Sequence, residues 1–315
     1  MNFSSLNSYI MNAAGPKDVT LEDLQILGES GSSTIVMKSC TLEPREGNPK
    51  PRWKELPLGG IQGMGLPNLG YKFYVDVIPK LQKHDTPIIA SVSGMSLEDN
   101  LKIIEAFQGT DVDAIELNLS CPNIKGKPQV GYDMEQTDEV LTAVQKINNK
   151  PLGIKLPPYH DGVHVAQMAA LVKKHKIDFI TTINSIGNCL IIDAEEETPI
   201  IKAKNGYGGL SGDYVKPVAL GNVRMFYEEL KDTDVQIIGV GGINNGTDAF
   251  EFLLAGAHAV QVGTVFVKEG PECFDKINDE LNQILKDKGY SNREDARGQL
   301  KVMTREPDES EEENL

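Results

Sequence analysis

A cysteine closes an apolar, strand-like segment near the middle of the chain, and polar side chains surround it. Cys121 follows residues 114–119, with Asn118 and Ser120 just before it and Asn123 just after it. A thiol can act as a nucleophile or accept a proton. Amides both donate and accept hydrogen bonds, which suits a planar ring bearing amides and carbonyls. A buried, inert cysteine is the commoner case, but these neighbours favour a function for Cys121.

Two lysines also fall at the ends of apolar segments, Lys38 after residues 34–37 and Lys155 within residues 152–156. A lysine in such a position is costly unless an anion or an electron-rich ring accompanies it. The pair therefore predicts an anionic ligand, or a cofactor that carries negative charge. The alternative is that each side chain extends along apolar surface and reaches water with its ammonium group.

Glycines and small polar residues close the remaining segments. Gly241-Gly242 and Gly263-Thr264 follow the last two apolar segments, while Ser39 and Asn184-Ser185 follow earlier ones. Backbone N–H groups in such turns can bind a phosphate, because glycine allows a close approach. Glycine pairs alone are common in tight turns. Their place after the last two segments strengthens the prediction of a phosphate site.

The elements that must position these residues recur regularly along the chain. Eight apolar segments are predicted strands, at residues 8–14, 34–38, 87–92, 114–119, 152–156, 179–183, 235–240 and 259–262. Continuous apolar strands are typical of parallel sheets buried on both faces. Helix-like segments separate them, and eight such units favour a closed (β/α)8 TIM barrel over an open doubly wound sheet. We expect one barrel domain over residues 1–303, with an apolar interior and its active site at the carboxyl ends of the strands.

The predicted helices carry amphipathic patterns and capping signals. Thr20 with Asp23, and Ser96 with Asp99, have the spacing of a capping box ahead of an apolar series. Further helices are predicted at residues 137–147, 163–175, 219–230, 247–255 and 271–288. Residues 40–70 and 186–218 lack periodicity, and we expect long functional loops there. The tail, residues 304–315, is strongly acidic and predicted to be disordered.

Composition excludes several classes of protein. The net charge is −15 and the pI about 4.8, which argues against nucleic-acid partners and anionic membrane surfaces. The four cysteines form neither a CxxC pair nor a metal-ligand cluster, and we interpret Cys189 and Cys273 as buried, inert residues. No signal peptide or apolar segment of membrane-spanning length is present, so we expect a cytoplasmic protein.

Several motifs together resemble one family. They are residues 116–123 with Gly126-Lys127-Pro128-Gln129, Arg45-Glu46-Gly47-Asn48-Pro49, Met64-Gly65-Leu66-Pro67-Asn68, Asn184-Ser185-Ile186-Gly187-Asn188 and Gly208-Gly209. In this order, over about residues 12–300, they closely resemble the class 1A (fumarate-type, cytosolic) dihydroorotate dehydrogenases. The resemblance implies a TIM barrel with FMN at its carboxyl-terminal mouth. It also implies a homodimer that oxidises dihydroorotate to orotate in pyrimidine biosynthesis and reduces fumarate to succinate.

The resemblance assigns roles to individual residues. Cys121 would remove the C5 proton while C6 gives a hydride to the flavin, Lys38 would touch flavin and substrate, and Lys155 would stabilise reduced flavin. The implied substrate-binding residues are Lys38, Gln62, Met64, Gly65, Leu66, Asn118, Asn123, Asn184 and Ser185. The implied FMN-binding residues are Ala14, Gly15, Lys38, Ser39, Asn118, Lys155, Ile183, Gly212, Gly241, Gly242, Gly263 and Thr264.

The chain departs from the family pattern at a few positions. Where the family has Ser-Ile-Asn-Ser-Met-Gly-Leu, this chain has Gly60-Ile61-Gln62-Gly63-Met64-Gly65-Leu66, so that Gln62 replaces a substrate-binding asparagine. Gly60 and Gly63 could give the longer side chain its room. Ser211 stands at a usual glycine, and Pro16-Lys17-Asp18 replaces the usual residues after Gly15.

Three alternatives stay open, and the departure at Gln62 motivates the first of them. The first is a flavin oxidoreductase on the same scaffold that acts on another dihydropyrimidine or an enone. The second is a lyase without flavin that uses Lys38 or Lys155 as a Schiff base. The third is a barrel that binds a ligand without catalysis.

Overall fold

The structure is a computed structural model that describes residues 1–81, 84–121 and 129–303. Eight parallel strands form a barrel in the order β1, β14, β13, β8, β7, β6, β5, β2. Their bounds are β1 Ile10–Asn12, β2 Ile35–Val36, β5 Ile88–Val92, β6 Ala114–Asn118, β7 Leu152–Leu156, β8 Phe179–Thr182, β13 Gln236–Val240 and β14 Ala259–Val262. Each lies within a predicted strand segment, so the predicted (β/α)8 barrel is confirmed.

Asn12 joins β1 and β2, which stand at the two ends of this strand order. Its Oδ1 accepts the backbone N–H of Val36 at 2.8 Å, and its Nδ2 donates to the Val36 carbonyl at 2.7 Å. The Asn12 side chain is fully buried. Its amide thus takes the place of a peptide group and completes the hydrogen bonding around the barrel.

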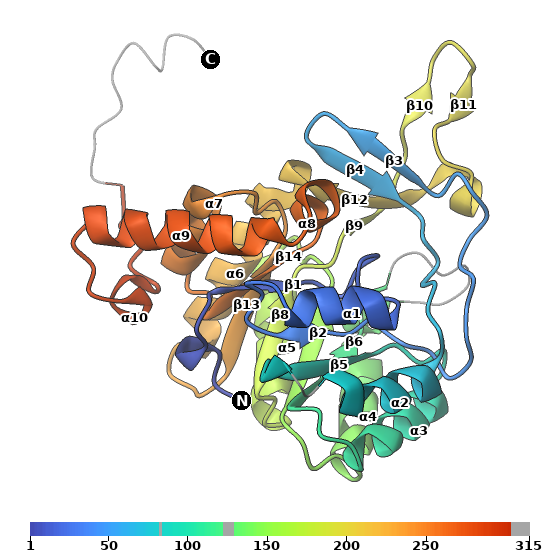
Figure 1. Cartoon of the computed structure of the whole chain (residues 1–315), viewed down its shortest axis with the longest axis horizontal. Helices are drawn as coiled ribbons and strands as arrows, with labels where there is room; N and C mark the ends of the chain where they lie inside the picture. Colours follow the sequence, from blue (N-terminus) through green and yellow to red (C-terminus); the bar gives the residue numbers. More distant parts are fainter. Residues whose placement is uncertain (82–83, 122–128, 304–315) are drawn as a thin grey trace.

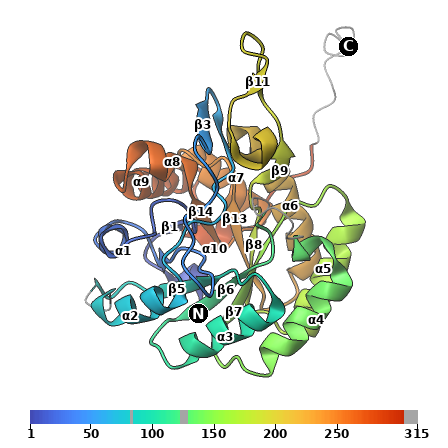
Figure 2. The ribbon, with the colours of Figure 1, turned by 90° about the vertical axis from the view of Figure 1, so that its right-hand side faces the viewer.

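Helices surround the strands (Figure 1, Figure 2). Seven lie where helices were predicted, namely α1 Leu21–Gly28, α3 Leu97–Gln108, α4 Met134–Gln145, α5 Gly162–Lys174, α6 Lys216–Leu230, α7 Gly246–Ala255 and α9 Glu272–Asp287. The capping box of Thr20 and Asp23 is present, and Ser96 caps α3 through the N–H of Asp99. Sequence analysis did not predict α2 Tyr71–Leu81, α8 Thr264–Glu269 or α10 Arg293–Ala296. Pro79 lies inside α2, where a proline is normally unfavourable.

The barrel interior is layered. The lower layer is apolar and consists of Met11, Val36, Ile89, Ala114, Phe179, Ile238 and Ala259, against which Phe3 packs from the amino-terminal end. Two residues further along four of these strands, the side chains are polar: Ser91, Glu116, Thr181 and Gln261 are all fully buried. Because side chains two apart share a face of a strand, these four form a second layer. The expectation of a wholly apolar interior was therefore wrong.

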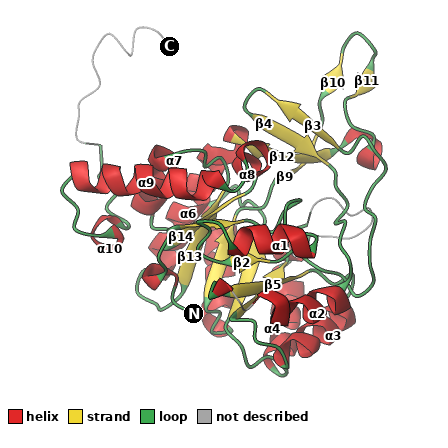
Figure 3. Ribbon diagram, in the orientation of Figure 1, coloured by secondary structure: helices red, strands yellow, loops and turns green. Residues whose placement is uncertain are grey.

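A second sheet covers the carboxyl-terminal end of the barrel, and we call it the roof sheet. Its strands are β3 Trp53–Leu56, β4 Gly59–Gln62, β12 Gly208–Gly212 and β9 Ile186–Cys189, paired antiparallel in that order. Figure 3 shows it apart from the barrel strands, beside the hairpin of β10 Ile192–Asp193 and β11 Thr198–Pro199. The prediction of long loops without secondary structure over residues 40–70 and 186–218 was thus wrong. Strands from one segment pair with a strand from the other, and this pairing cannot be recognised in the sequence of either segment by itself.

Candidate active site

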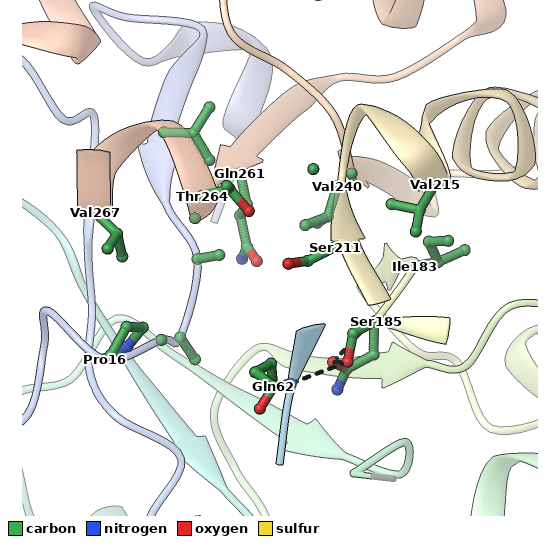
Figure 4. Close-up of a pocket in the computed structure, with 18 of the residues that line it drawn as sticks. Pro16, Gln62, Ile183, Ser185, Ser211, Val215, Val240, Gln261, Thr264 and Val267 are labelled. Carbon is green, nitrogen blue, oxygen red and sulfur yellow. Dashed lines mark hydrogen bonds between the residues drawn. The ribbon is translucent and has the colours of Figure 1, made fainter. Parts of the chain in front are cut away.

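A cavity of about 420 Å³ lies between the roof sheet and the carboxyl ends of the barrel strands (Figure 4). The predicted site residues that line it are Ala14, Gly15, Lys38, Ser39, Gln62, Met64, Leu66, Asn118, Cys121, Lys155, Ile183, Asn184, Ser185, Gly212, Gly241, Gly242, Gly263 and Thr264. Gly65 is not among the lining residues, and Asn123 lies outside the described residues. The structure thus brings residues from nearly every barrel strand and from the roof sheet to one place.

Cys121 lies beside a network of amides and hydroxyls. The Asn118 Oδ1 accepts hydrogen bonds from the backbone N–H and the Oγ of Ser120, at 3.1 and 3.0 Å. Asn184 Nδ2 donates to the Ser120 Oγ at 3.0 Å, and the N–H of Ser185 donates to Asn184 Oδ1 at 2.8 Å. The network fixes the orientation of both asparagine amides. Cys121 is half-buried at the edge of the cavity.

Lys38 is accompanied by a buried carboxylate that sequence analysis did not predict. Its Nζ donates to the Gly15 carbonyl at 2.5 Å, and the fully buried Asp18 accepts the Gly15 N–H at 2.7 Å. Burial raises the pKa of Asp18 to about 7, and the positive charge of Lys38 opposes this. Burial also lowers the pKa of Lys38, against the effect of Asp18 and Cys121. Asp18 thus places a second ionisable group behind Lys38 at this side of the cavity.

Lys155 has a counter-charge of its own. Its Nζ donates to Gln261 Oε1 at 3.0 Å and lies 4.0 Å from Glu116 Oε1. The side chains of Lys155 and Glu116 are 5% and 0% exposed, so the two charges share an interior from which water is excluded. A buried cation is tolerated when a carboxylate accompanies it. The lysines alone were therefore weaker evidence for an anionic ligand than the sequence suggested.

Gln62 reaches from the roof sheet across the cavity. Its Nε2 donates to the Ser185 Oγ at 3.2 Å, and its Oε1 accepts the backbone N–H of Met64 at 3.1 Å (Figure 4). Gln62 faces Gly209 across the β4–β12 ladder. A Cβ at Gly209 would lie 2.4 Å from the Ser185 Oγ and 3.0 Å from Gln62 Nε2. Gly209 thus provides the room for the longer amide side chain.

Gly60 and Gly63 make room for side chains other than that of Gln62, so the expectation that they accommodate Gln62 was wrong. A Cβ at Gly60 would lie 3.3 Å from Nε1 of Trp53, whose indole also lines the cavity. A Cβ at Gly63 would lie 2.5 Å from the Ala203 Cβ. The two glycines allow close packing of the roof sheet against its own side chains.

One side of the cavity has the character of a phosphate cradle. Gly212, Gly241 and Gly242 have φ values of +80°, +130° and +74°, in the region that favours glycine. A Cβ at Gly263 would have the Ala13 Cβ at 3.7 Å as its one near neighbour, so the Gly263 backbone is open to the cavity. Thr264 adds a hydroxyl beside it. Glycine backbone and a hydroxyl fit the phosphate of a nucleotide-like cofactor.

Several lining residues were missed by sequence analysis. Trp53, Asn244 and Gln261 are polar or aromatic, and Ala13, Val215, Val240, Ile243, Val262 and Val267 form an apolar wall. A signal existed for Gln261 and Glu116, because each is a polar residue in the middle of an apolar strand. Trp53 had none, since its segment appeared to be a loop.

The remaining cysteines and any metal site can be assessed within residues 1–81, 84–121 and 129–303. Cys273 is buried, as predicted, whereas Cys189 is half-buried, so its interpretation as a buried residue was wrong. In these ranges no cluster of His, Cys, Asp and Glu could hold a metal ion. None of the helices described there is long and apolar enough to cross a bilayer.

A (β/α)8 barrel with a thiol, two lysines and clustered amides in a covered cavity at its carboxyl-terminal end defines the class of the protein: a barrel enzyme. Residues 3–285 match the dihydroorotate dehydrogenase family. The chain belongs to this family.

Relatives with known names agree with this assignment. The chain is 49% identical to dihydroorotate dehydrogenase A (fumarate) of Lactococcus lactis subsp. cremoris (strain MG1363), over 93% of this chain and 95% of that one. It is 47% identical to dihydroorotate dehydrogenase (fumarate) of Kluyveromyces lactis, over 94% and 95%. The fold resembles a crystal structure of ligand-free DHODH from Eimeria tenella, with a TM-score of 0.77 and 23% identity over 92% of this chain and 88% of that one.

Proposed function

We propose that the protein oxidises dihydroorotate to orotate with FMN as its cofactor and fumarate as the electron acceptor. The observation that carries the proposal is the position of Cys121, which lines the same cavity as Lys38 and the amides of Asn118 and Asn184. A base and a set of amide partners at one cavity match a planar substrate that carries amides and loses a proton.

The glycine-rich side of the cavity supports FMN as the cofactor. Gly212, Gly241, Gly242, Gly263 and Thr264 would hold its phosphate. Ala14, Gly15, Ser39, Asn118, Lys155 and Ile183 would contact the rest of it. When bound, FMN would supply a two-electron acceptor for the hydride that leaves C6 of the substrate.

The protein's own residues would bind the substrate and remove its proton. Cys121, as its thiolate, would accept the proton from C5 and become the neutral thiol, because it is an acid–base group at the edge of the cavity beside the amides. Asn118, Asn184 and Ser185 would orient the ring, with Asn123 and the backbone from Met64 to Leu66 as further contacts. The roof sheet would keep water from the reacting atoms. Lys38 would contact both substrate and cofactor.

We also infer a cytosolic homodimer. Trp53 on the roof sheet, Leu58 in the turn between β3 and β4, and Ile192 on the neighbouring hairpin are exposed apolar side chains that support contact with a second copy. Light scattering of the purified protein tests this.

Anaerobic titration decides the function. Dihydroorotate should bleach the flavin absorbance of the purified protein, and fumarate should restore it faster than NAD does. A yellow protein that dihydroorotate leaves oxidised would instead favour another dihydropyrimidine or an enone, which the Gln62 substitution makes the first alternative. A colourless protein that takes up no FMN would favour the Schiff-base lyase, for which the lowered pKa of Lys38 is the supporting observation.

A further inference from the structure

Glu116 is a fully buried carboxylate that lies behind the cavity-lining residues Lys155 and Gln261, and the proposed function assigns it no role. It belongs to the polar layer of the barrel, and its two oxygens accept hydrogen bonds from side chains on three other strands, β14, β8 and β5. Oε2 accepts from Gln261 Nε2 at 3.1 Å and from the Thr181 Oγ1 at 2.8 Å. Oε1 accepts from the Ser91 Oγ at 3.4 Å.

One chain of hydrogen bonds, which we call the cofactor arm, leads from Glu116 to Lys155. Gln261 uses its Nε2 to donate to Glu116, so its Oε1 must face the Lys155 ammonium, which donates to it at 3.0 Å. Lys155 also lies 4.0 Å from Glu116 Oε1. The carboxylate therefore fixes both the orientation of the Gln261 amide and the position of the cation in the cavity wall.

A second chain, the substrate arm, leads from Glu116 to Asn118. Because Ser91 donates to Glu116, it accepts from the Ser39 Oγ at 2.8 Å, and Ser39 in turn accepts from Asn118 Nδ2 at 3.2 Å. The Oδ1 of Asn118 is then directed to Ser120. An acceptor that carries charge at the end of the chain sets the direction of every donor in it.

We propose that Glu116 is a positioning residue whose one carboxylate holds the cofactor-side cation Lys155 through Gln261 and the substrate-side amide of Asn118 through Ser91 and Ser39. The proposal rests on the proposed function, since it assumes FMN on the Lys155 side and dihydroorotate on the Asn118 side. It predicts that the two arms can be broken separately.

Four variants of the full-length protein test the proposal. Gln261→Met breaks the cofactor arm and Ser91→Ala the substrate arm, while Glu116→Gln alters both. Thr181→Val is the matched control, because Thr181 donates to the same carboxylate but belongs to neither arm. The readouts are the FMN dissociation constant, the midpoint potential of the bound flavin, orotate binding to the holoprotein, and the thermal midpoint of unfolding.

We expect Gln261→Met to weaken FMN binding about tenfold, as typical for loss of a supporting partner, and to make the potential more negative because Lys155 is no longer held. Ser91→Ala should weaken orotate binding and raise KM while the potential stays unchanged. Glu116→Gln should weaken orotate binding too and make the potential more positive, because a negative charge beside Lys155 is lost. Thr181→Val should lower thermal stability only.

Two results would overturn the proposal. In the first, all four variants lose thermal stability, while FMN affinity, the flavin midpoint potential and orotate binding stay at their wild-type values. The other is an equal change of every readout in Gln261→Met and Ser91→Ala, which would mean that the arms are not separate. If Glu116→Gln does not fold, Gln261→Met and Ser91→Ala still test whether the two arms act separately. Wild-type protein that fails to bind FMN, or that dihydroorotate leaves oxidised, refutes the proposed function instead.

Discussion

Ser211 Oγ donates a hydrogen bond to the carbonyl oxygen of Gly60, 3.1 Å away, and the two residues face each other across the β4–β12 ladder. Both positions depart from the pattern of the family that the sequence resembles, which has serine at position 60 and glycine at position 211. The hydroxyl has thus moved from one strand of the roof sheet to the strand opposite. Because the two changes compensate across one ladder, they are consistent with an unchanged substrate.

Replacing Gly209 should damage the substrate side of the cavity. In Gly209→Ala the new methyl group would lie 2.4 Å from the Ser185 Oγ, so the Gln62–Ser185 hydrogen bond should break. Steady-state kinetics should show a KM for dihydroorotate raised about tenfold, the effect of roughly 1.4 kcal/mol, with FMN still bound. Gly221→Ala, on α6 with open space around its Cα, is the control and should keep the wild-type KM. An unchanged KM in Gly209→Ala would contradict this account of Gln62.

Removing the thiol of Cys121 should stop proton removal without emptying the cofactor site. Cys121→Ala should lower the rate of flavin reduction by about 10²–10⁴-fold, the usual contribution of a general base. Stopped-flow mixing with dihydroorotate measures this rate, and the flavin spectrum measures FMN content. Cys189→Ala, which removes a half-buried thiol outside the cavity lining, should leave the rate unchanged. Full activity in Cys121→Ala would assign the base to another residue.

The Asn12 amide should be important for the stability of the barrel. Asn12→Ala leaves the N–H and C=O of Val36 without the partners they have in the wild type. Unsatisfied buried groups cost about 1–3 kcal/mol each, so the free energy of unfolding should fall by a few kcal/mol in urea titrations. Asn149→Ala, at an exposed position, should change it by less than about 0.5 kcal/mol. If Asn12→Ala lowered the free energy of unfolding by less than about 0.5 kcal/mol, β1 and β2 would hold together without the Asn12 side chain.

His258 should make the fold sensitive to acid. Burial, with a contribution from Arg297, lowers the pKa of His258 to about 4, and its Nδ1 accepts the backbone N–H of Ile237 at 3.0 Å. Below pH 6.5 the unfolded chain takes up a proton at this histidine, whereas the folded chain does so only near pH 4. Stability should therefore fall as pH drops from about 6.5 to 4, by at most about 3 kcal/mol.

The variant His258→Asn lacks this titration and should show a smaller loss of stability over the same pH range. Urea midpoints at several pH values measure the difference. His160→Asn, at an exposed position, should retain the wild-type slope. Parallel curves for the wild type and His258→Asn would rule out His258 as the source of the acid sensitivity.

The barrel was predictable because its strands are buried on both faces, which produces continuous apolar segments that can be recognised one at a time. The roof sheet was not, because its strands are short and rich in glycine and each takes its partner from a distant segment. The sequence placed Cys121, Lys38 and Lys155 at strand ends, where the structure has them. It could not show that Asp18 and Glu116 lie beside the two lysines. Glu116 meets Lys155 through the pairing of β6 with β7, and Asp18 meets Lys38 where its backbone carbonyl accepts the Lys38 N–H. Asn123 and the acidic tail lie outside the described residues, so the predictions for them stay predictions.

The pairing of Gly60 with Ser211 joins residues 151 positions apart in the chain. A contact of such long range carries a cost in loop-closure entropy, because the intervening chain must lose its freedom. A nascent polypeptide that has emerged only as far as β8 has neither β12 nor the glycines that follow β13 and β14. The cavity thus lacks its glycine-rich side until the chain has reached β14, and FMN uptake during refolding should report the completion of the native topology.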